Sequence, residues 1–268
     1  MLFRSTGSGG ALSDTDTVAI TVVQTTPADP NDNDSLVPPT NTNTSGTEVS
    51  TNVWEGTTGS DTITTGGGSQ SIYGGAGNDI IASGAGGDSV YGGSGNDTIN
   101  GGSSGDALYG GSGNDSIIGD QGADTIVGGQ GADNLRGDSV SNPNSGNDKF
   151  VFTNLTDSLV NAFDTITDFD PGHDTIQVPH AVTSGDFNNS FYLTPVVASH
   201  GSLSAELVAI LNSGNLNEYG AAEVTITGSA YQGTYVVVND TTPGFDPLHD
   251  AVIKLSNAAA VAHTDFVV

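Results

Sequence analysis

A nine-residue pattern, Gly-Gly-x-Gly-x-Asp-x-U-x with U a large aliphatic residue, recurs between residues 56 and 151 and constrains the fold more than any other feature of the chain. The copies that begin at Gly74, Gly92 and Gly110 match it completely. The aliphatic position is apolar in nine successive copies, at Ile63, Ile72, Ile81, Val90, Ile99, Leu108, Ile117, Ile126 and Leu135. A period of nine fits neither a helix nor an alternating strand, so it indicates a repeated supersecondary unit.

Each copy combines a turn with a strand. Glycine at the first, second and fourth positions permits a sharp turn with positive φ and a close approach of other atoms. The three residues x-U-x are long enough for a short strand whose central side chain points inward. Two copies then form one turn of a flattened coil. We therefore expect an all-β fold, a right-handed parallel β-roll in which loops eighteen residues apart stack on one another.

This stacking brings the acidic positions together at two edges. One edge collects Asp61, Asp79, Asp97, Asp115 and Asp133, and the other collects Gln70, Asp88, Asp106 and Asp124. Carboxylates stacked at a strand spacing of ~4.8 Å repel one another unless a cation lies between them. Oxygen ligands in a flexible cage suit Ca²⁺ better than Mg²⁺, and the chain has no Cys and no paired His for zinc.

Over residues 56–151 the repeat resembles the calcium-binding nonapeptide of the RTX (repeats-in-toxin) family. The resemblance implies that each ion lies between two stacked loops. One loop contributes the carbonyls of its second and fourth positions and its Asp, and the stacked loop contributes its first and third positions and its Asp. Roughly six to eight ions follow if each is six-coordinate. The implied metal ligands are Asp61, Gly75, Gly77, Asp79, Gly84, Gly86, Asp88, Gly92, Gly93, Ser94, Gly95, Asp97, Gly102, Asp106, Gly111, Gly113, Asp115, Gly122, Asp124, Gly129, Gly131, Asp133 and Asp148.

Departures from the pattern mark weaker positions. Gln70 replaces an Asp, so a site built on it loses charge. Other residues replace glycines, namely Thr57, Thr65, Ser104, Asp120 and Asp138. Six extra residues, 139–144, precede the next Gly-Asn-Asp. When the position of the next acid in the nine-residue series is moved by these six residues, it falls on Asp148. We expect these six residues to form a surface loop at the end of the coil.

Metal binding is expected to be part of folding. Ordering each residue costs ~1–2 kcal/mol of backbone entropy, whereas one buried aliphatic per nine residues recovers only ~1.5–3 kcal/mol. The repeat region is therefore predicted to be unfolded without calcium and folded with it.

The rest of the chain divides by composition. Residues 1–26 contain one strand pattern, which looks like the remnant of a cadherin-like or Ig-like domain, and residues 27–53 form a flexible, disordered linker. The β-roll is assigned to residues 54–151, with Val53 and Trp54 covering its open end. Residues 152–268 are expected to form a small β-rich cap, with strands at 191–197, 223–227, 234–238 and 251–255 and a helix at 204–211 capped by Ser202 or Ser204.

Three C-terminal segments carry further resemblances. Residues 163–176 are similar to the segment that closes the coil of serralysin-type secreted proteins, and residues 234–253 look like a bluetail domain. The ending Asp265-Phe-Val-Val268 resembles the uncleaved signal of type I secretion substrates, and it is equally compatible with a final edge strand. These resemblances imply the type I secretion machinery as a partner and an extracellular or cell-surface location.

Composition excludes several classes of function. A formal charge of −27, from 31 acids and 4 bases, makes nucleic acid an unfavourable partner, and no apolar run is long enough for a membrane span. No His-Glu-x-x-His is present, and Gly101-Gly-Ser-Ser-Gly105 lies inside a repeat rather than at a nucleophile elbow. We therefore expect a non-enzymatic, calcium-binding module that folds after secretion. Alternatives are the end of a large surface adhesin, or the non-catalytic tail of a secreted hydrolase or epimerase.

Overall fold

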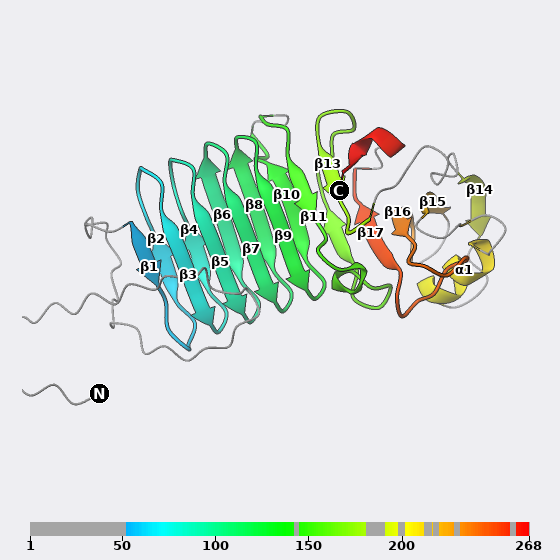
Figure 1. Cartoon of the computed structure of the whole chain (residues 1–268), viewed down its shortest axis with the longest axis horizontal. Coiled ribbons are helices and arrows are strands. Elements are labelled where there is room, and N and C mark those ends of the chain that lie inside the picture. The colour runs from blue at the N-terminus through cyan, green and yellow to red at the C-terminus, as the bar shows by residue number, and fades with distance from the viewer. Residues whose placement is uncertain are drawn as a thin grey trace, which may run out of the picture.

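The computed structural model describes residues 52–141, 145–180, 191–197, 202–211, 216, 220–227, 231–257 and 261–267. These residues form a parallel β-solenoid of about five turns, followed by a β-rich C-terminal part with the single α-helix of the described chain (Figure 1). The expected remnant strand and all but the last two residues of the expected linker lie outside the described residues.

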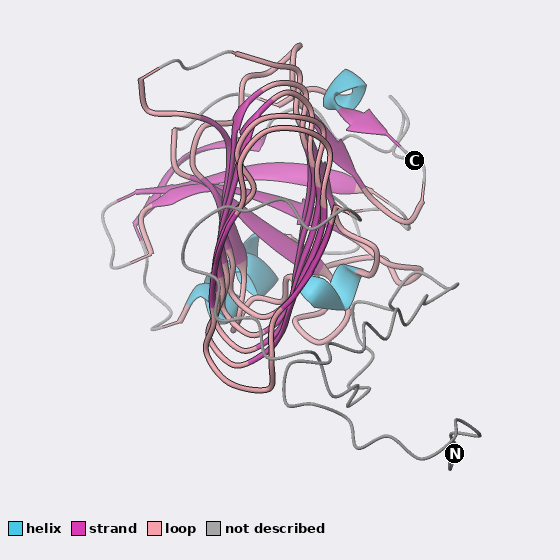
Figure 2. Ribbon diagram, turned by 90° about the vertical axis from the view of Figure 1, so that its left-hand side faces the viewer, coloured by secondary structure: helices cyan, strands magenta, loops and turns pink. Residues whose placement is uncertain are grey.

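Two sheets face each other along the coil, and their turns stack at both edges (Figure 2). One sheet contains, in spatial order, β1 (Val53–Glu55), β3 (Ser71–Ala76), β5 (Ser89–Ser94), β7 (Ala107–Ser112), β9 (Thr125–Gln130), β11 (Lys149–Val151), β13 (Thr175–Gln177) and β18 (Phe266–Val267). The other contains β2 (Thr62–Thr64), β4 (Ile80–Ala82), β6 (Thr98–Ser103), β8 (Ser116–Gln121), β10 (Asn134–Asp138), β12 (Asp164–Ile166), β17 (Ala251–Leu255), β16 (Gly233–Val238), β15 (Ala221–Thr227) and β14 (Phe191–Val197).

The eighteen-residue register is confirmed. Ile63 pairs with Ile81 in one sheet, and Ile72 pairs with Val90 in the other, so the aliphatic positions form two facing rows. All nine of these aliphatic side chains are buried, and together they make the core of the roll. Most strands are six residues long rather than three, because the glycines after x-U-x stay in register with stacked glycines, as Gly75 does with Gly93.

The ends of the core are covered by larger side chains. At the N-terminal end β1 pairs with β3, and Trp54 is half-buried against the core, as expected, whereas Val53, also predicted to cover this end, is 43% exposed because it points to the other side of the strand. At the other end the sheets continue past residue 151 through β11, β12 and β13, where Phe150, Phe152 and Phe169 are buried. On the outer face of the first sheet, Tyr73, Tyr91 and Tyr109 stack in the same register, with ring centroids 5.0 and 4.7 Å apart.

The C-terminal part has the expected elements. Strands β14 to β17 lie at the four predicted positions, and helix α1 (Leu203–Ile210) begins one residue earlier than predicted, with the Ser202 hydroxyl accepting the Ala205 N–H at 3.2 Å. Strands β15 and β16, and β16 and β17, pair antiparallel, whereas β17 joins β12 in parallel. The described residues also contain two 3₁₀ turns, η1 (Leu155–Asp157) and η2 (His263–Asp265). The chain end forms edge strand β18, in which Phe266 pairs with Ile176.

Candidate metal centre

The aspartates of one edge are joined by a ladder of hydrogen bonds. Each Oδ1 accepts the backbone N–H of the residue at the same position in the preceding stacked loop. The N–H groups of Asp61, Asp79, Asp97 and Asp115 donate to the Oδ1 atoms of Asp79, Asp97, Asp115 and Asp133 at 2.7, 2.8, 2.7 and 2.8 Å. We call this row of loops the Asp79 edge, and its predicted membership is confirmed.

The opposite row, the Asp88 edge, has the same ladder. The N–H groups of Gln70, Asp88 and Asp106 donate to the Oδ1 atoms of Asp88, Asp106 and Asp124, each at 2.8 Å. The next bond runs from Asp124 N–H to Asp148 Oδ1 at 2.9 Å and spans 24 residues instead of 18. The six-residue insertion therefore leaves the phase of the ladder intact, as the sequence predicts.

Two further aspartates continue the ladders and are not among the predicted ligands. Asp164 Oδ1 accepts the Asp133 N–H at 2.8 Å, and Asp174 Oδ1 accepts the Asp148 N–H at 2.9 Å. Asp164-Thr-Ile166 has none of the preceding glycines, and Asp174-Thr-Ile176 keeps only the fourth-position glycine, Gly172. The signal that identifies them is the Asp-x-U triplet with at most one glycine before it, which is too short to be recognised without the structure.

The second carboxylate oxygen of most of these aspartates has no hydrogen-bond partner, although Asp174 Oδ2 accepts the Asp170 N–H at 2.8 Å. Within the described residues, nine Oδ2 atoms are buried without a hydrogen bond, those of Asp79, Asp88, Asp97, Asp106, Asp115, Asp124, Asp133, Asp148 and Asp164. A buried, unpaired carboxylate oxygen is costly. A repeated series of such atoms, one per loop, fits a cation in each gap between stacked loops.

Asp61 in the first turn is different. Its Oδ2 accepts the N–H of Thr57 at 2.5 Å and the Thr57 hydroxyl at 2.8 Å. Gln70 is held similarly, since its Oε1 accepts the Thr65 hydroxyl at 3.2 Å and its amide donates to the Gly67 carbonyl at 3.0 Å. The first turn thus satisfies its in-phase side chains by hydrogen bonds within the loop.

Backbone carbonyls point into the same gaps. A Cβ built on Gly74 lies 2.5 Å from both Asp79 Oδ2 and the carbonyl oxygen of Gly92, so these two oxygens of successive loops flank one glycine-lined space. A Cβ on Gly93 overlaps the carbonyl of Gly75, and one on Gly95 overlaps that of Gly77. The second-position and fourth-position carbonyls therefore face the next loop, which agrees with the ligand arrangement implied by the repeat.

Most of the glycines among the predicted ligands occupy the left-handed region of the backbone. Positive φ is adopted by Gly75, Gly77, Gly84, Gly86, Gly93, Gly95, Gly102, Gly111, Gly113, Gly122, Gly129 and Gly131. The Ser94 carbonyl faces the preceding loop and accepts the Gly77 N–H at 2.8 Å. No three His, Cys, Asp or Glu side chains in the described part of the chain converge on a metal site, so backbone carbonyls must supply most ligands.

Burial alters the electrostatics of the carboxylates. Desolvation raises the pKa of Asp79, Asp124 and Asp133 to about 6, and that of Asp106, Asp115 and Asp148 to about 7. At Asp164, where burial is almost complete and Asp133 adds repulsion, the pKa is raised to about 9. Backbone hydrogen bonds to Oδ1 oppose these shifts. A divalent cation in the gaps would favour the ionised forms.

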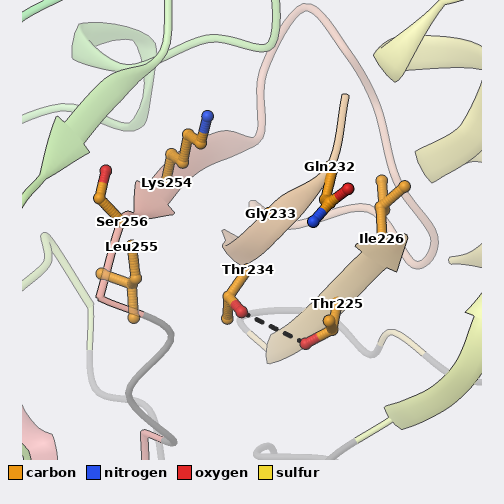
Figure 3. Close-up of a pocket in the computed structure, with 8 residues that line it drawn as sticks. All are labelled: Thr225, Ile226, Gln232, Gly233, Thr234, Lys254, Leu255 and Ser256. Carbon is orange, nitrogen blue, oxygen red and sulfur yellow. Dashed lines mark hydrogen bonds between the residues drawn. The ribbon is translucent and has the colours of Figure 1, made fainter. Parts of the chain in front are cut away.

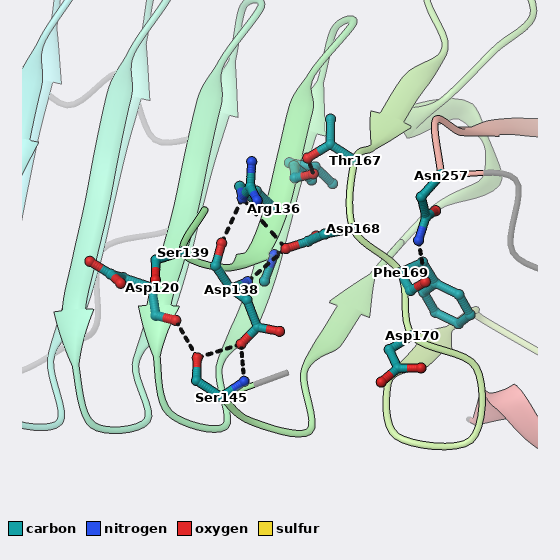
Figure 4. Close-up of polar contacts among 12 residues, drawn as sticks. Asp120, Arg136, Asp138, Ser139, Ser145, Thr167, Asp168, Phe169, Asp170 and Asn257 are labelled. Atoms are coloured by element: carbon teal, nitrogen blue, oxygen red, sulfur yellow. Dashed lines mark hydrogen bonds and ion pairs between the residues drawn. The ribbon is translucent and has the colours of Figure 1, made fainter. Parts of the chain in front are cut away.

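Other carboxylates serve in turns. Asp168 accepts the N–H groups of Gly137 and Asp138 at 3.0 and 2.8 Å and lies 3.6 Å from Arg136 Nε, beside the inserted loop (Figure 4). Asp250 accepts the N–H groups of Asp240 and Asp246 at 2.9 and 2.7 Å. These hydrogen bonds hold the backbone of the turns in which they occur.

One pocket lies on the C-terminal part, away from both edges (Figure 3). It opens at the ends of β15, β16 and β17 and is lined by Thr225, Ile226, Gln232, Gly233, Thr234, Lys254, Leu255 and Ser256. The Thr225 and Thr234 hydroxyls are 3.3 Å apart. No carboxylate lines this pocket, so the pocket is not one of the candidate metal sites.

The parallel β-roll, with buried aspartates in its stacked glycine-rich turns, places this chain in the class of repeat β-solenoids. The family model described as Peptidase M10 serralysin C terminal matches residues 40–238, so the chain belongs to this family. No curated protein matches the chain. Among solved structures, the solution structure of the AlgE6R3 subunit from the Azotobacter vinelandii mannuronan C5-epimerase is 21% identical over 82% of this chain and 80% of that chain. The TM-score of this match is 0.29, a value too low to establish a common fold.

Proposed function

We propose that this chain is a calcium-binding, non-enzymatic β-roll that folds when it meets calcium outside the cell. The observation that supports this most directly is the series of buried Asp Oδ2 atoms without partners, of which those of Asp79, Asp97, Asp106, Asp115 and Asp124 each lie beside a carbonyl of the next loop. Carboxylate and carbonyl oxygens in a backbone cage are ligands that Ca²⁺ prefers. Members of this family of β-rolls bind calcium.

The proposed ligands of one gap come from two stacked loops. In the gap between the loops of Asp79 and Asp97, they are the carbonyls of Gly75 and Gly77, those of Gly92 and Ser94, and the two carboxylates. Repetition of this set along both edges extends the series to Asp148, and the structure adds Asp164 and Asp174 as candidates at its end.

The extracellular part of the proposal is supported by the family, whose members come from secreted proteins. Among the described residues, none forms a helix with the length and hydropathy needed to cross a membrane. Export by a type I machinery requires an unfolded chain. An acidic repeat that stays unfolded at low calcium and orders at extracellular concentrations, to which modules with Kd of ~10⁻⁴–10⁻³ M respond, meets that requirement.

The test is a calcium titration of the whole chain followed by far-ultraviolet circular dichroism, with magnesium as the control. We expect a cooperative change from coil to β structure in the sub-millimolar to millimolar range, and no such change with magnesium. A spectrum that is indifferent to calcium, or an equal response to magnesium, would contradict the proposal.

A further inference from the structure

The two edges of the roll differ in composition, and this difference matters if the proposed calcium sites exist. The complete copies of the repeat, which begin at Gly74, Gly92, Gly110 and Gly128, all lie on the Asp79 edge. Between Thr65 and Asp148, the positions that break the pattern lie on the Asp88 edge, namely Thr65, Gln70, Ser83, Ser104, Asp120 and Asp138. One repeat therefore builds two chemically distinct rows of loops.

The Asp79 edge has a second ladder, formed by asparagines at the position before the Asp. Asn78 Oδ1 accepts the Asn96 N–H at 2.8 Å, and Asn96 Oδ1 accepts the Asn114 N–H at 2.8 Å. Asn114 Oδ1 continues the row by accepting the Ala132 N–H at 2.9 Å. These bonds connect consecutive loops without any ion, so they fix the spacing of each gap before a cation enters it.

In the middle loops of the Asp88 edge, Gly87, Gly105 and Ala123 stand at the corresponding position and offer no side-chain acceptor. Two of its turns also place residues with a Cβ in the left-handed region, Ser104 with φ 86° and Asp120 with φ 81°. This conformation is unfavourable for such residues. The loops of the Asp88 edge are therefore less well ordered in advance, and their first member, Gln70, supplies no charge.

We propose that the two edges are two classes of calcium site that load in order, the Asp79 edge first and the Asp88 edge second, with Asn78, Asn96 and Asn114 as positioning residues. Calcium affinity depends on ligand charge and on the rigidity of the site, and a site ordered in advance loses less free energy on binding. The asparagine ladder gives the Asp79 edge this advantage.

The test is isothermal titration calorimetry of the whole chain with calcium alone, comparing Asp97→Asn with Asp106→Asn. The two aspartates belong to neighbouring loops on opposite edges. Asn keeps an oxygen for the N–H of Asp79 or Asp88 and removes one charge in each variant. We expect two binding phases in the wild type. Asp97→Asn should weaken the tighter phase by about tenfold or more, the scale on which disturbed metal sites lose affinity, and Asp106→Asn should weaken only the looser phase.

A second comparison tests the asparagines themselves. The double variant Asn96→Ala/Asn114→Ala removes two ladder acceptors and leaves every carboxylate in place. We expect its tighter phase to move toward the looser one, with the looser phase unchanged, because a general loss of stability would move both phases. Asn161→Ala, at an exposed position on neither edge, is the control and should leave both phases unchanged.

The outcomes separate this inference from the proposal on which it rests. A single binding phase in the wild type, equal effects of Asp97→Asn and Asp106→Asn, or loss of the tighter phase in Asp106→Asn would overturn the order of loading while calcium binding stands. If the wild type gives neither heat nor a change in circular dichroism with calcium, the proposed function itself fails. If Asp97→Asn does not fold in saturating calcium, the double asparagine variant decides the question.

Discussion

The two oxygens of each repeat aspartate have separate roles. From Asp79 to Asp148, Oδ1 accepts a backbone N–H of the preceding stacked loop and so connects the loops, whereas Oδ2 is buried without a hydrogen bond. Sequence periodicity predicts which residues are stacked, because the period places equal positions above one another. It does not predict how one carboxylate divides its oxygens, because that depends on the local geometry of the turn.

The raised pKa values predict how the calcium-free chain responds to pH. Burial raises the pKa of Asp106, Asp115 and Asp148 to about 7, from an unfolded value near 4. A carboxyl with a raised folded pKa contributes stability that is present below the unfolded pKa and is lost as the pH rises through the folded pKa. With a chelator present, we therefore expect β structure to increase on acidification from pH 8 to pH 5.

Circular dichroism across this pH range checks the prediction. A calcium titration in weak buffer at pH 7 should also release protons, because the cation favours the ionised carboxylates. β structure that increases with pH in the presence of a chelator would contradict it.

A glycine in the turn gives a second prediction at the residue scale. Gly93 has φ 113°, and a Cβ there overlaps the Gly75 carbonyl of the stacked loop. Gly93→Ala should destabilise the calcium-loaded roll by about 2–5 kcal/mol, the sum of ~1–2 kcal/mol for the left-handed conformation and ~1–3 kcal/mol for overpacking. Denaturant unfolding in calcium measures the change. Gly66→Ala is the control, because a Cβ there meets nothing within 4 Å.

At the scale of elements, the repeat determines the strands but not how the C-terminal part joins them. The positions of β14 to β17 and of α1 are predictable from local patterns. The parallel pairing of β17 with β12, far apart in the sequence, is not, because no local pattern records a long-range partner. Asp164 and Asp174 are missed for a related reason, since their turns lack most of the glycines that make the repeat recognisable.

The junction between these parts depends on Ser158. Its buried hydroxyl donates to the Val252 carbonyl and accepts the Asp164 N–H, both at 2.7 Å, so it connects β17 to the start of β12. Ser158→Ala should lower the free energy of unfolding by about 1–3 kcal/mol, because it leaves a buried donor without its partner. Denaturant unfolding in saturating calcium measures this, and Ser69→Ala, at an exposed loop position, should have no effect.

At the scale of the whole molecule, each turn contacts mainly its neighbours, as in other solenoids. The ends therefore matter more than in a globular core. Trp54 lies against the N-terminal end, and Phe150, Phe152 and Phe169 are buried beyond the last complete repeat. A net charge of −27 adds repulsion that cations must offset.

A chain shortened after Val151 tests the importance of the C-terminal end. It lacks β12, which pairs with Leu135, β13, which pairs with Phe150, and β17, and these strands continue both sheets. We expect its folding transition in a calcium titration to move to several-fold higher calcium and to become less steep, because the last turns lose their neighbours. Circular dichroism of the shortened and full chains gives both midpoints, and identical curves would show that the roll needs no C-terminal cover.

The six residues inserted before Asp148 show what this architecture can accommodate. The ladder passes from Asp124 to Asp148 with a bond of 2.9 Å, and Phe150 enters the core beside Ile126. Chain length at an edge can therefore change freely, provided that the next Asp-x-U triplet returns to its place in the stack. Foreign peptides inserted at residues 139–144 should then be displayed on the surface without disturbing the turns on either side, which makes this edge a natural position for adding a binding epitope to a calcium-controlled scaffold.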